Sequence, residues 1–176
     1  MNAESYKMLE SMSKKELILL LEDMTKRWLA HDGVWFQCVE FSSGMEDAVE
    51  MDALSWQRFA VIEAGRIMKL HHIKPDGGLS ALKKALKLRG YAFLNDYEII
   101  DTGENIMTYR INTCRVQSVR EWKDMEHFPC KSVGIQEYSN FAKTIDPRIK
   151  TRCITCPPDE KPDGYVCAWE FTLQEE

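Results

Sequence analysis

The residues with the most chemical potential are cysteines, and five of the six follow residue 113. Cys153 and Cys156 form a C-x-x-C unit, a spacing that lets two thiolates converge from a tight turn on a tetrahedral metal. Cys130 stands at the start of a predicted helix, where the helix dipole lowers the pKa of a thiol. The pattern predicts a zinc or iron–sulfur centre held by Cys130, Cys153, Cys156 and Cys167, with Cys114 as the alternate ligand.

Two other interpretations of these cysteines stay open. Free cysteine is among the most buried residue types, so Cys114 and Cys167 are also expected as packed core thiols in strands. Cys153 and Cys156 also have the spacing of a redox dithiol. The sequence shows no secretion-signal pattern, so we expect the protein in the cytoplasm, where structural disulfides are rare.

Polar residues on apolar helix faces form a second candidate site. Asp52 and Glu63 fall inside the apolar stripe of a long predicted helix. A buried carboxylate must be paired, bind a metal or be protonated. His31 lies on the stripe of the preceding helix, and in an antiparallel pair it could meet Glu63 as a general acid/base couple. The simpler alternative is that Glu63 bonds to Arg66 or a sheet arginine and that His31 caps a helix end.

Three polar residues beside Cys114 predict a ligand-binding surface. Arg110 and Asn112 share one face of a predicted strand by its period of two, and Arg115 follows. Such a set can bind a carboxylate ligand, although a strand arginine also commonly pairs with an acid of the protein itself. Trp35, on the stripe with His31, completes the predicted ligand-binding set.

The elements that must position these residues change character near residue 90. Residues 1–90 have helical periodicity, whereas residues 91–176 alternate in strands around one further helix. This order predicts one α+β domain over residues 1–176, with N-terminal helices followed by an antiparallel sheet and a helix packed across it. The expected helices cover 13–30, 34–44, 46–70, 79–86 (closed by Gly90 in a left-handed conformation) and 130–145, and the expected strands cover 91–100, 106–119, 148–154 and 165–173.

Charge and hydropathy exclude several partner classes. The net charge is −5 and basic residues are dispersed, which argues against nucleic-acid binding. The longest aliphatic run, Leu17 to Leu21, is far shorter than the roughly 20 residues of a membrane span. We therefore expect a small-molecule ligand as the partner, with a homodimer as the commonest form of self-association.

Several short stretches carry a resemblance to a known family. The sequence is similar to uncharacterised prokaryotic cytosolic proteins related to L-2-amino-thiazoline-4-carboxylic acid hydrolase, and the similarity spans nearly the whole chain. The stretches that carry it are Trp28 to Phe36, Asn112 to Gln117, Phe128 to Gly134, Ile145 to Cys153, Cys156 to Asp159 and Cys167 to Phe171.

The second half also resembles, more distantly, the 4-vinyl reductase domain, an α+β fold shared with TRAPP trafficking subunits. Cys153, followed by Cys167-Ala168-Trp169-Glu170-Phe171, matches the order of that domain's final strands, except that Phe171 stands where the pattern has an aliphatic residue. The Cys156-Pro157-Pro158 stretch is a further departure. This resemblance implies a small-ligand pocket beside the sheet, in some members with a metal or cluster.

Three functions follow as expectations. The first is a cytosolic protein that binds a small ligand and holds a cysteine-rich metal centre. The second is a metal-assisted hydrolase of a small cyclic C–N bond, in which Glu63 moves protons while His31 and Arg110 position a carboxylate. The third is a non-catalytic sensor or assembly module of the 4-vinyl reductase type.

Overall fold

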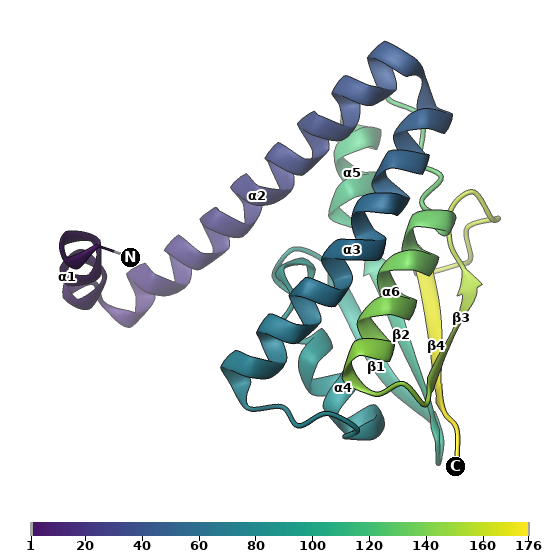
Figure 1. The fold of residues 1–176 in the computed structure, drawn as a ribbon. Coiled ribbons are helices and arrows are strands. Elements are labelled where there is room, and N and C mark those ends of the chain that lie inside the picture. Colours follow the sequence, from purple (N-terminus) through teal and green to yellow (C-terminus); the bar gives the residue numbers. More distant parts are fainter. Residues whose placement is uncertain (1, 176) are drawn as a thin grey trace.

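The computed structural model describes residues 2–175, and its order of elements agrees with the predicted α+β class. Four helices and a short 3₁₀ helix precede the first strand, and two helices lie between the two strand pairs (Figure 1). The elements are α1 (Ala3–Ser11), α2 (Lys14–Ser43), α3 (Met45–His71), α4 (Gly78–Leu86), η1 (Gly90–Phe93), β1 (Asp96–Gly103), β2 (Ile106–Thr113), α5 (Arg115–Trp122), α6 (Lys131–Ile145), β3 (Ile149–Thr155) and β4 (Cys167–Leu173).

The sheet has the strand order β1-β2-β4-β3, and every neighbouring pair is antiparallel. Tyr109 on β2 is the register partner of Trp169 on β4 and, with Phe171, faces the buried side of the sheet. Helix α6 packs across this side, where Tyr138 contacts the rings of all three. Helix α3 packs along α6, so the core lies between the sheet and this helix pair (Figure 1).

Helix α2 is continuous, and the break expected at residues 31–33 was wrong. A glycine inside a helix costs only about 1 kcal/mol, and ring contacts on both sides of Gly33 hold the helix in place. Trp28 packs against Tyr91, and Phe36 packs against Phe128. The helix starts at the predicted Ser13 capping box and ends before Gly44, whose φ of 98° lies in the left-handed region.

The expected strand over residues 106–119 was also too long. Strand β2 ends at Thr113 and α5 begins at Arg115. Gln117 and Arg120, three residues apart, are both buried on one face of α5. This helical pattern of burial takes the place of the strand-like alternation that the sequence suggested. Upstream, residues 90–93 form η1, so β1 starts at Asp96, and Gly90 begins η1 without the left-handed conformation expected of it.

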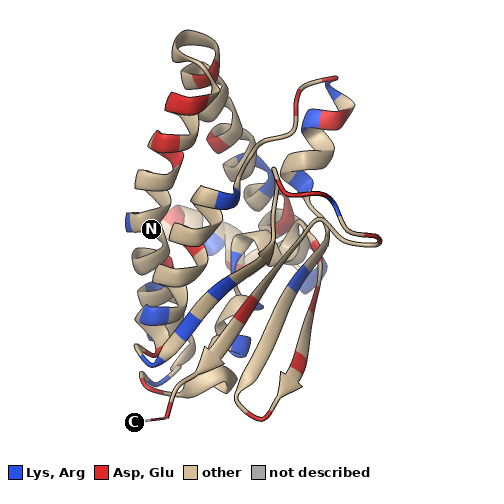
Figure 2. Ribbon diagram, turned by 90° about the vertical axis from the view of Figure 1, so that its right-hand side faces the viewer, with Lys and Arg blue, Asp and Glu red and all other residues tan. Residues whose placement is uncertain are grey.

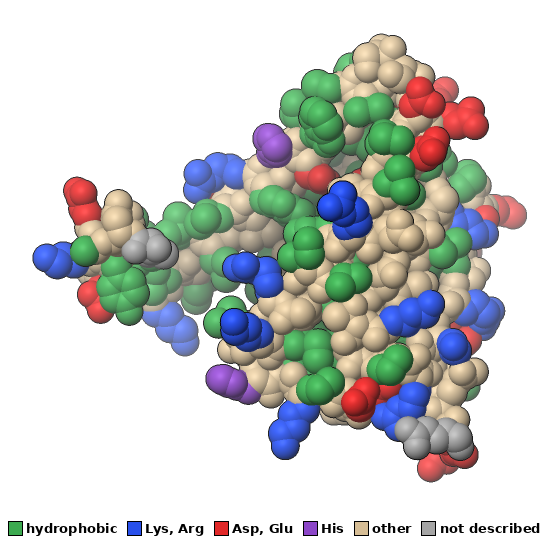
Figure 3. Space-filling view, viewed as in Figure 1, with side chains coloured by type: hydrophobic (Ala, Val, Ile, Leu, Met, Phe, Trp, Pro, Cys, Tyr) green, Lys and Arg blue, Asp and Glu red, His purple; other side chains and the backbone are tan. Residues whose placement is uncertain are grey.

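The surfaces differ between the sheet and the N-terminal helices. The strands of the sheet carry charged residues of both signs (Figure 2), some of them paired, for example Arg152 with Glu170. Helix α1 and the first half of α2 project from the body (Figure 1), and Figure 3 shows apolar side chains along this projection. Leu19 and Leu21, in the first half of α2, are exposed. No helix within residues 2–175 is long and apolar enough to cross a membrane.

Candidate functional site

A cavity of about 320 Å³ lies where α2 and α3 face α5, α6 and one end of the sheet. Its floor is formed by the tight approach of α6 to the sheet: a Cβ on Gly134 would lie 2.5 Å from the Trp169 ring. The indole N–H of Trp169 is buried and has no hydrogen-bond partner within residues 2–175. The walls are mainly apolar, and the aromatic residues that line them are Phe36, Trp56, Tyr91, Phe128, Tyr138 and Trp169.

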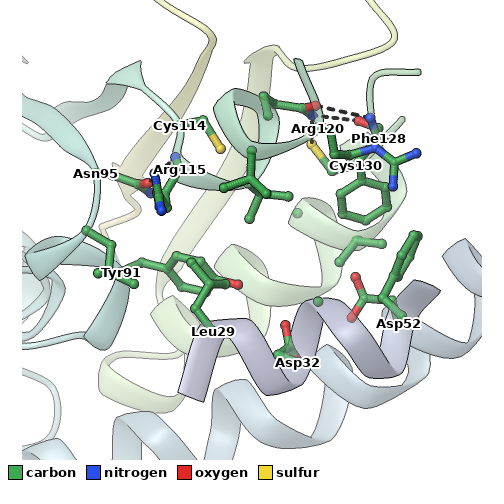
Figure 4. Close-up of a pocket in the computed structure, with 18 of the residues that line it drawn as sticks. Leu29, Asp32, Asp52, Tyr91, Asn95, Cys114, Arg115, Arg120, Phe128 and Cys130 are labelled. Atoms are coloured by element: carbon green, nitrogen blue, oxygen red, sulfur yellow. Dashed lines mark hydrogen bonds between the residues drawn. The ribbon is translucent and has the colours of Figure 1, made fainter. Parts of the chain in front are cut away.

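Three carboxyl groups line the cavity from three different helices. Asp32 comes from α2, Asp52 from α3 and Glu137 from α6. Figure 4 shows the carboxyls of Asp32 and Asp52 turned toward the space between their helices and α5, and the hydroxyl of Tyr91 approaches from the side. Among residues 2–175 neither Asp32 nor Asp52 forms a salt bridge, and the charge of His31 acts on Asp32 alone of the two.

Burial makes the charged forms of these acids unfavourable. It raises the pKa of Asp52 to about 8, helped by the charges of Asp32 and Glu137 and opposed by a hydrogen bond from Trp56. Burial likewise raises the pKa of Asp32, against a small opposing effect of His31. The cavity therefore contains two carboxyls whose ionisation a bound cation would favour.

The third acid, Glu137, belongs to a buried ion-pair network. Arg89 is only 1% exposed, and it bonds Glu137 through Nη1 at 2.7 Å and Glu63 through Nε at 2.9 Å. Its guanidinium also lies 4.7 Å from the Phe141 ring centroid. The alternative in which Glu63 simply pairs with an arginine is thus what the structure shows, although that arginine is neither Arg66 nor part of the sheet.

The structure does not bring the predicted acid/base couple together. Glu63 faces Arg89, His31 is exposed to solvent, and neither residue lines the cavity. Trp35 is 67% exposed and points away from the cavity lining in the same way. The acids next to these positions, Asp32 on α2 and Asp52 on α3, are the ones that reach the cavity.

The predicted carboxylate-binding pair holds a carboxylate of the protein itself. Arg110 donates from Nη2 to Glu98 on the neighbouring strand β1, and Asn112 donates to the same carboxylate at 3.2 Å. The Arg110 guanidinium also lies 5.2 Å from the Tyr165 ring centroid. Of the predicted set only Arg115 lines the cavity: it is exposed at the start of α5, and its backbone N–H donates to Asn95.

Four thiols also line the cavity, those of Cys114, Cys130, Cys156 and Cys167, and a close contact joins Cys130 and Cys156. Their sulfur atoms are 3.5 Å apart, and the Cys156 thiol also forms a hydrogen bond with the Cys167 thiol on β4. Gln117 donates to the sulfur of Cys130 at 3.7 Å. In Figure 4 the sulfurs of Cys114 and Cys130 lie across the cavity from Asp32 and Asp52.

The environments of these thiols differ. The hydrogen bond with Cys156 lowers the pKa of Cys130, assisted by Gln117 and opposed by burial. The same bond, together with that to Cys167, raises the pKa of Cys156. Burial raises the pKa of Cys114 to about 12 and that of Cys153 to about 11. Among Cys114, Cys130, Cys153 and Cys156, therefore, only Cys130 has a lowered pKa.

The C-x-x-C unit does not form the expected tight turn. Cys153 lies inside the extended strand β3 and Cys156 follows the strand's end, so three residues of extended chain separate their Cα atoms by about 10 Å. Within residues 2–175 no three side chains of His, Cys, Asp or Glu are grouped so that they could hold a metal ion. The four residues of the predicted centre do not fit a tetrahedral site in this arrangement, and the zinc or iron–sulfur centre stays a prediction.

Sequence reasoning missed several residues of the site. Tyr91 and Gln117 were assigned to strands, Asp32 to the break between two helices, and Glu137 was not singled out. A signal existed for Glu137, because it lies four residues after Val133 and four before Phe141, both on the buried face of α6. No signal along the chain marks Gln117, because its position is fixed by the backbone of Phe128. The Gln117 side-chain amide donates to the Phe128 carbonyl at 2.7 Å and accepts from the Phe128 N–H at 3.0 Å.

Fold and cavity define the class: an α+β protein with a partly open, acid- and thiol-lined cavity between a helical pair and a four-stranded antiparallel sheet. The chain belongs to DUF6125, a family of unknown function, whose sequence profile matches residues 10–173. A search of curated proteins found no match to this sequence.

Proposed function

We propose that this protein binds a small organic cation with an apolar body, such as an aryl or alkyl amine or an amidine. The observation that carries this proposal is the pair Asp32 and Asp52, two half-buried carboxyls that line the same cavity and form no salt bridge among residues 2–175. A cation between them supplies the missing counter-charge and stabilises the ionised carboxylates.

The remaining walls suit the apolar part of such a ligand. Aromatic rings attract cations over their faces and bury large apolar area, and Trp56, Tyr91 and Phe128 all line the cavity. The volume of about 320 Å³ lies at the lower end of the roughly 300–1,000 Å³ typical of ligand pockets. Arg115, exposed at the rim, offers a second contact to a ligand that also carries a carboxylate.

Binding is tested by calorimetric titration of the purified full-length chain with matched probes. Benzylamine and benzamidine represent cations, benzyl alcohol a neutral compound and benzoate an anion of similar size. We expect measurable binding only for the cations, and a loss of about tenfold or more on Asp52→Asn, because one carboxylate contact of about 1.5–3 kcal/mol is removed. Glu50→Gln, which removes an exposed charge from the same helix, should leave affinity unchanged.

Equal binding of the alcohol and the amine, or unchanged affinity in Asp52→Asn, would contradict the proposal. Proton release completes the test: at pH 7 a cation should expel a proton from Asp52, whose pKa is about 8 in the free protein. The measured enthalpy should therefore depend on the ionisation enthalpy of the buffer, and an enthalpy independent of the buffer would rule out this role for Asp52.

Hydrolysis of a small cyclic C–N substrate is a second candidate, and one observation favours it. A carboxyl whose pKa lies near the working pH is suited to proton transfer, and Asp52 meets that condition. Glu63, by contrast, is held in an ion pair with Arg89 outside the cavity. Turnover of 2-aminothiazoline-4-carboxylate by the purified protein, lost in Asp52→Asn and kept in Glu50→Gln, would establish this function. Binding without turnover would leave the protein as a ligand-binding module.

A further inference from the structure

The contact between Cys130 and Cys156 is independent of the acids and has no role in cation binding. The two sulfurs lie 3.5 Å apart, although 26 residues separate the cysteines in the chain. A disulfide requires about 2.05 Å between its sulfurs, so the pair must close by only about 1.5 Å. Cys156 bonds to both Cys130 and Cys167, whereas Cys153 of the C-x-x-C unit lies on extended chain. Of these two contacts, the one with Cys130 joins Cys156 to the thiol at the start of α6.

The segments that carry the two thiols are fastened to each other. The backbone N–H of Lys131 donates to the carbonyl of Pro157 at 2.9 Å. The Lys131 ammonium bonds both oxygens of Asp159 at 2.8 and 2.9 Å, and the same carboxylate accepts the backbone N–H of Cys156 at 3.3 Å. These bonds hold the start of α6 against the loop after β3, so the sulfurs meet without a rearrangement of the chain.

The surroundings prepare one sulfur as a nucleophile and leave it accessible. Cys130 is the N-cap residue of the 15-residue helix α6, and Gln117, itself 2% exposed, donates to its sulfur. Gln117 is fixed in turn by two hydrogen bonds to the backbone of Phe128. Both Cys130 and Cys156 line the cavity, which gives a small apolar reagent a route to the sulfur atoms.

We propose that Cys130 and Cys156 are a redox-active dithiol that reduces a small organic hydroperoxide. The Cys130 sulfur attacks the terminal peroxide oxygen, the O–O bond breaks, and the alkoxide leaves as an alcohol with the thiol proton of Cys130. Cys130 is then a sulfenic acid. The Cys156 sulfur then attacks the Cys130 sulfur and displaces the hydroxyl of the sulfenic acid, which leaves as water with the thiol proton of Cys156. One hydroperoxide becomes an alcohol and water while two thiols become one disulfide, and two molecules of a small thiol restore the pair by exchange.

The test begins with the unmodified full-length protein, reduced and desalted without oxygen. One equivalent of cumene hydroperoxide is added, remaining thiols are alkylated, and peptides from trypsin and Glu-C digestion are read by mass spectrometry. The expected result is the loss of two thiols per hydroperoxide and a cross-link between the peptide containing Cys130 and that containing Cys156, reversed by dithiothreitol. A disulfide between Cys153 and Cys156, or between Cys156 and Cys167, would overturn the assignment.

Variants assign the two roles. Cys156→Ser should stop at the sulfenic acid of Cys130, which dimedone traps, and a purely structural thiol would give no such adduct. Cys130→Ser should slow peroxide consumption by about tenfold or more, because the sulfur that attacks the peroxide is absent. Cys153→Ser and the exposed Cys38→Ser are the matched controls and should retain the wild-type cross-link and rate.

Metal analysis of the same preparation separates this proposal from a metal centre at the same cysteines. Protein that contains about one zinc per chain, and whose thiols resist one equivalent of hydroperoxide until the metal is chelated, would overturn the redox role. Protein that forms the Cys130–Cys156 cross-link as isolated supports it. Failure of the amine titrations would leave this result untouched, because Asp32 and Asp52, which carry the amine proposal, lie across the cavity from Cys130.

Discussion

Replacing Asp52 by Asn should stabilise this protein at neutral pH, and the effect should disappear in acid. The carboxyl has a pKa of about 8 in the folded chain against 3.8 ordinarily. As pH rises from about 4 to about 8, the unfolded chain therefore releases a proton that the folded chain keeps, and stability is lost over this window. Asparagine has nearly the same shape, can still accept a hydrogen bond from Trp56, and carries no charge to bury.

The magnitude follows from the size of the shift. A difference of roughly four pKa units at about 1.36 kcal/mol per unit sets an upper limit of about 5–6 kcal/mol above pH 8. The cavity admits water, and ionised sites in proteins behave as if the effective dielectric constant were about 20, so we expect about 1–3 kcal/mol at pH 7.5. Asp32 from α2, Glu137 from α6 and Tyr91 from η1 are the titratable groups that act on this carboxyl.

Urea unfolding at pH 4.5 and pH 7.5 measures the effect for wild type, Asp52→Asn and the exposed control Glu50→Gln. The midpoint of Asp52→Asn should exceed that of wild type at pH 7.5 and approach it at pH 4.5, while the control follows wild type at both. A variant that is destabilised to the same extent at both pH values would refute the reasoning. That outcome would mean that the Asp52 carboxyl contributes to stability through its shape or hydrogen bonding, and that burying its charge has no measurable cost.

Two further predictions concern the core. Gly134→Ala should destabilise the fold by about 1–3 kcal/mol in urea unfolding, because its Cβ would lie 2.5 Å from the Trp169 ring. Gly65→Ala, on α3 with open space around its Cβ, should instead stabilise by about 0.5–1 kcal/mol, and a similar loss at both sites would contradict the packing argument. Arg89→Met should cost about 3–5 kcal/mol because two buried carboxylates lose their cation, whereas the surface variant Arg27→Met should change stability by less than about 1 kcal/mol.

Local patterns determined the elements that their own residues can form. The Ser13 capping box and the glycine at position 44 mark the two ends of α2, because caps act within one turn of the chain. The alternation up to Thr113 identified β2, since side chains of a strand point to opposite faces in turn. Signals of this range also placed Cys130 at the start of α6 and led correctly to an α+β fold.

Patterns along the chain were less informative where partners distant in sequence compete. Gly33 reads as a break, yet α2 continues because ring contacts with Tyr91 and Phe128 on either side stabilise the helix. The apolar stripe of α3 singled out Glu63 and Asp52 equally. Arg89, which arrives from a different element, neutralises Glu63 and leaves Asp52 without a counter-charge.

The thiols show most clearly what the sequence by itself determined and what tertiary structure decided. The sequence established that cysteines crowd the second half and that one of them begins a helix. The packing of α6 against the loop after β3 decided which thiols come into contact. It brings Cys130 next to Cys156 and leaves Cys153 on extended chain. The physical reason is that the spacing of residues along the chain determines contacts only between residues close in sequence. A contact between residues 26 positions apart depends on how whole helices and strands pack.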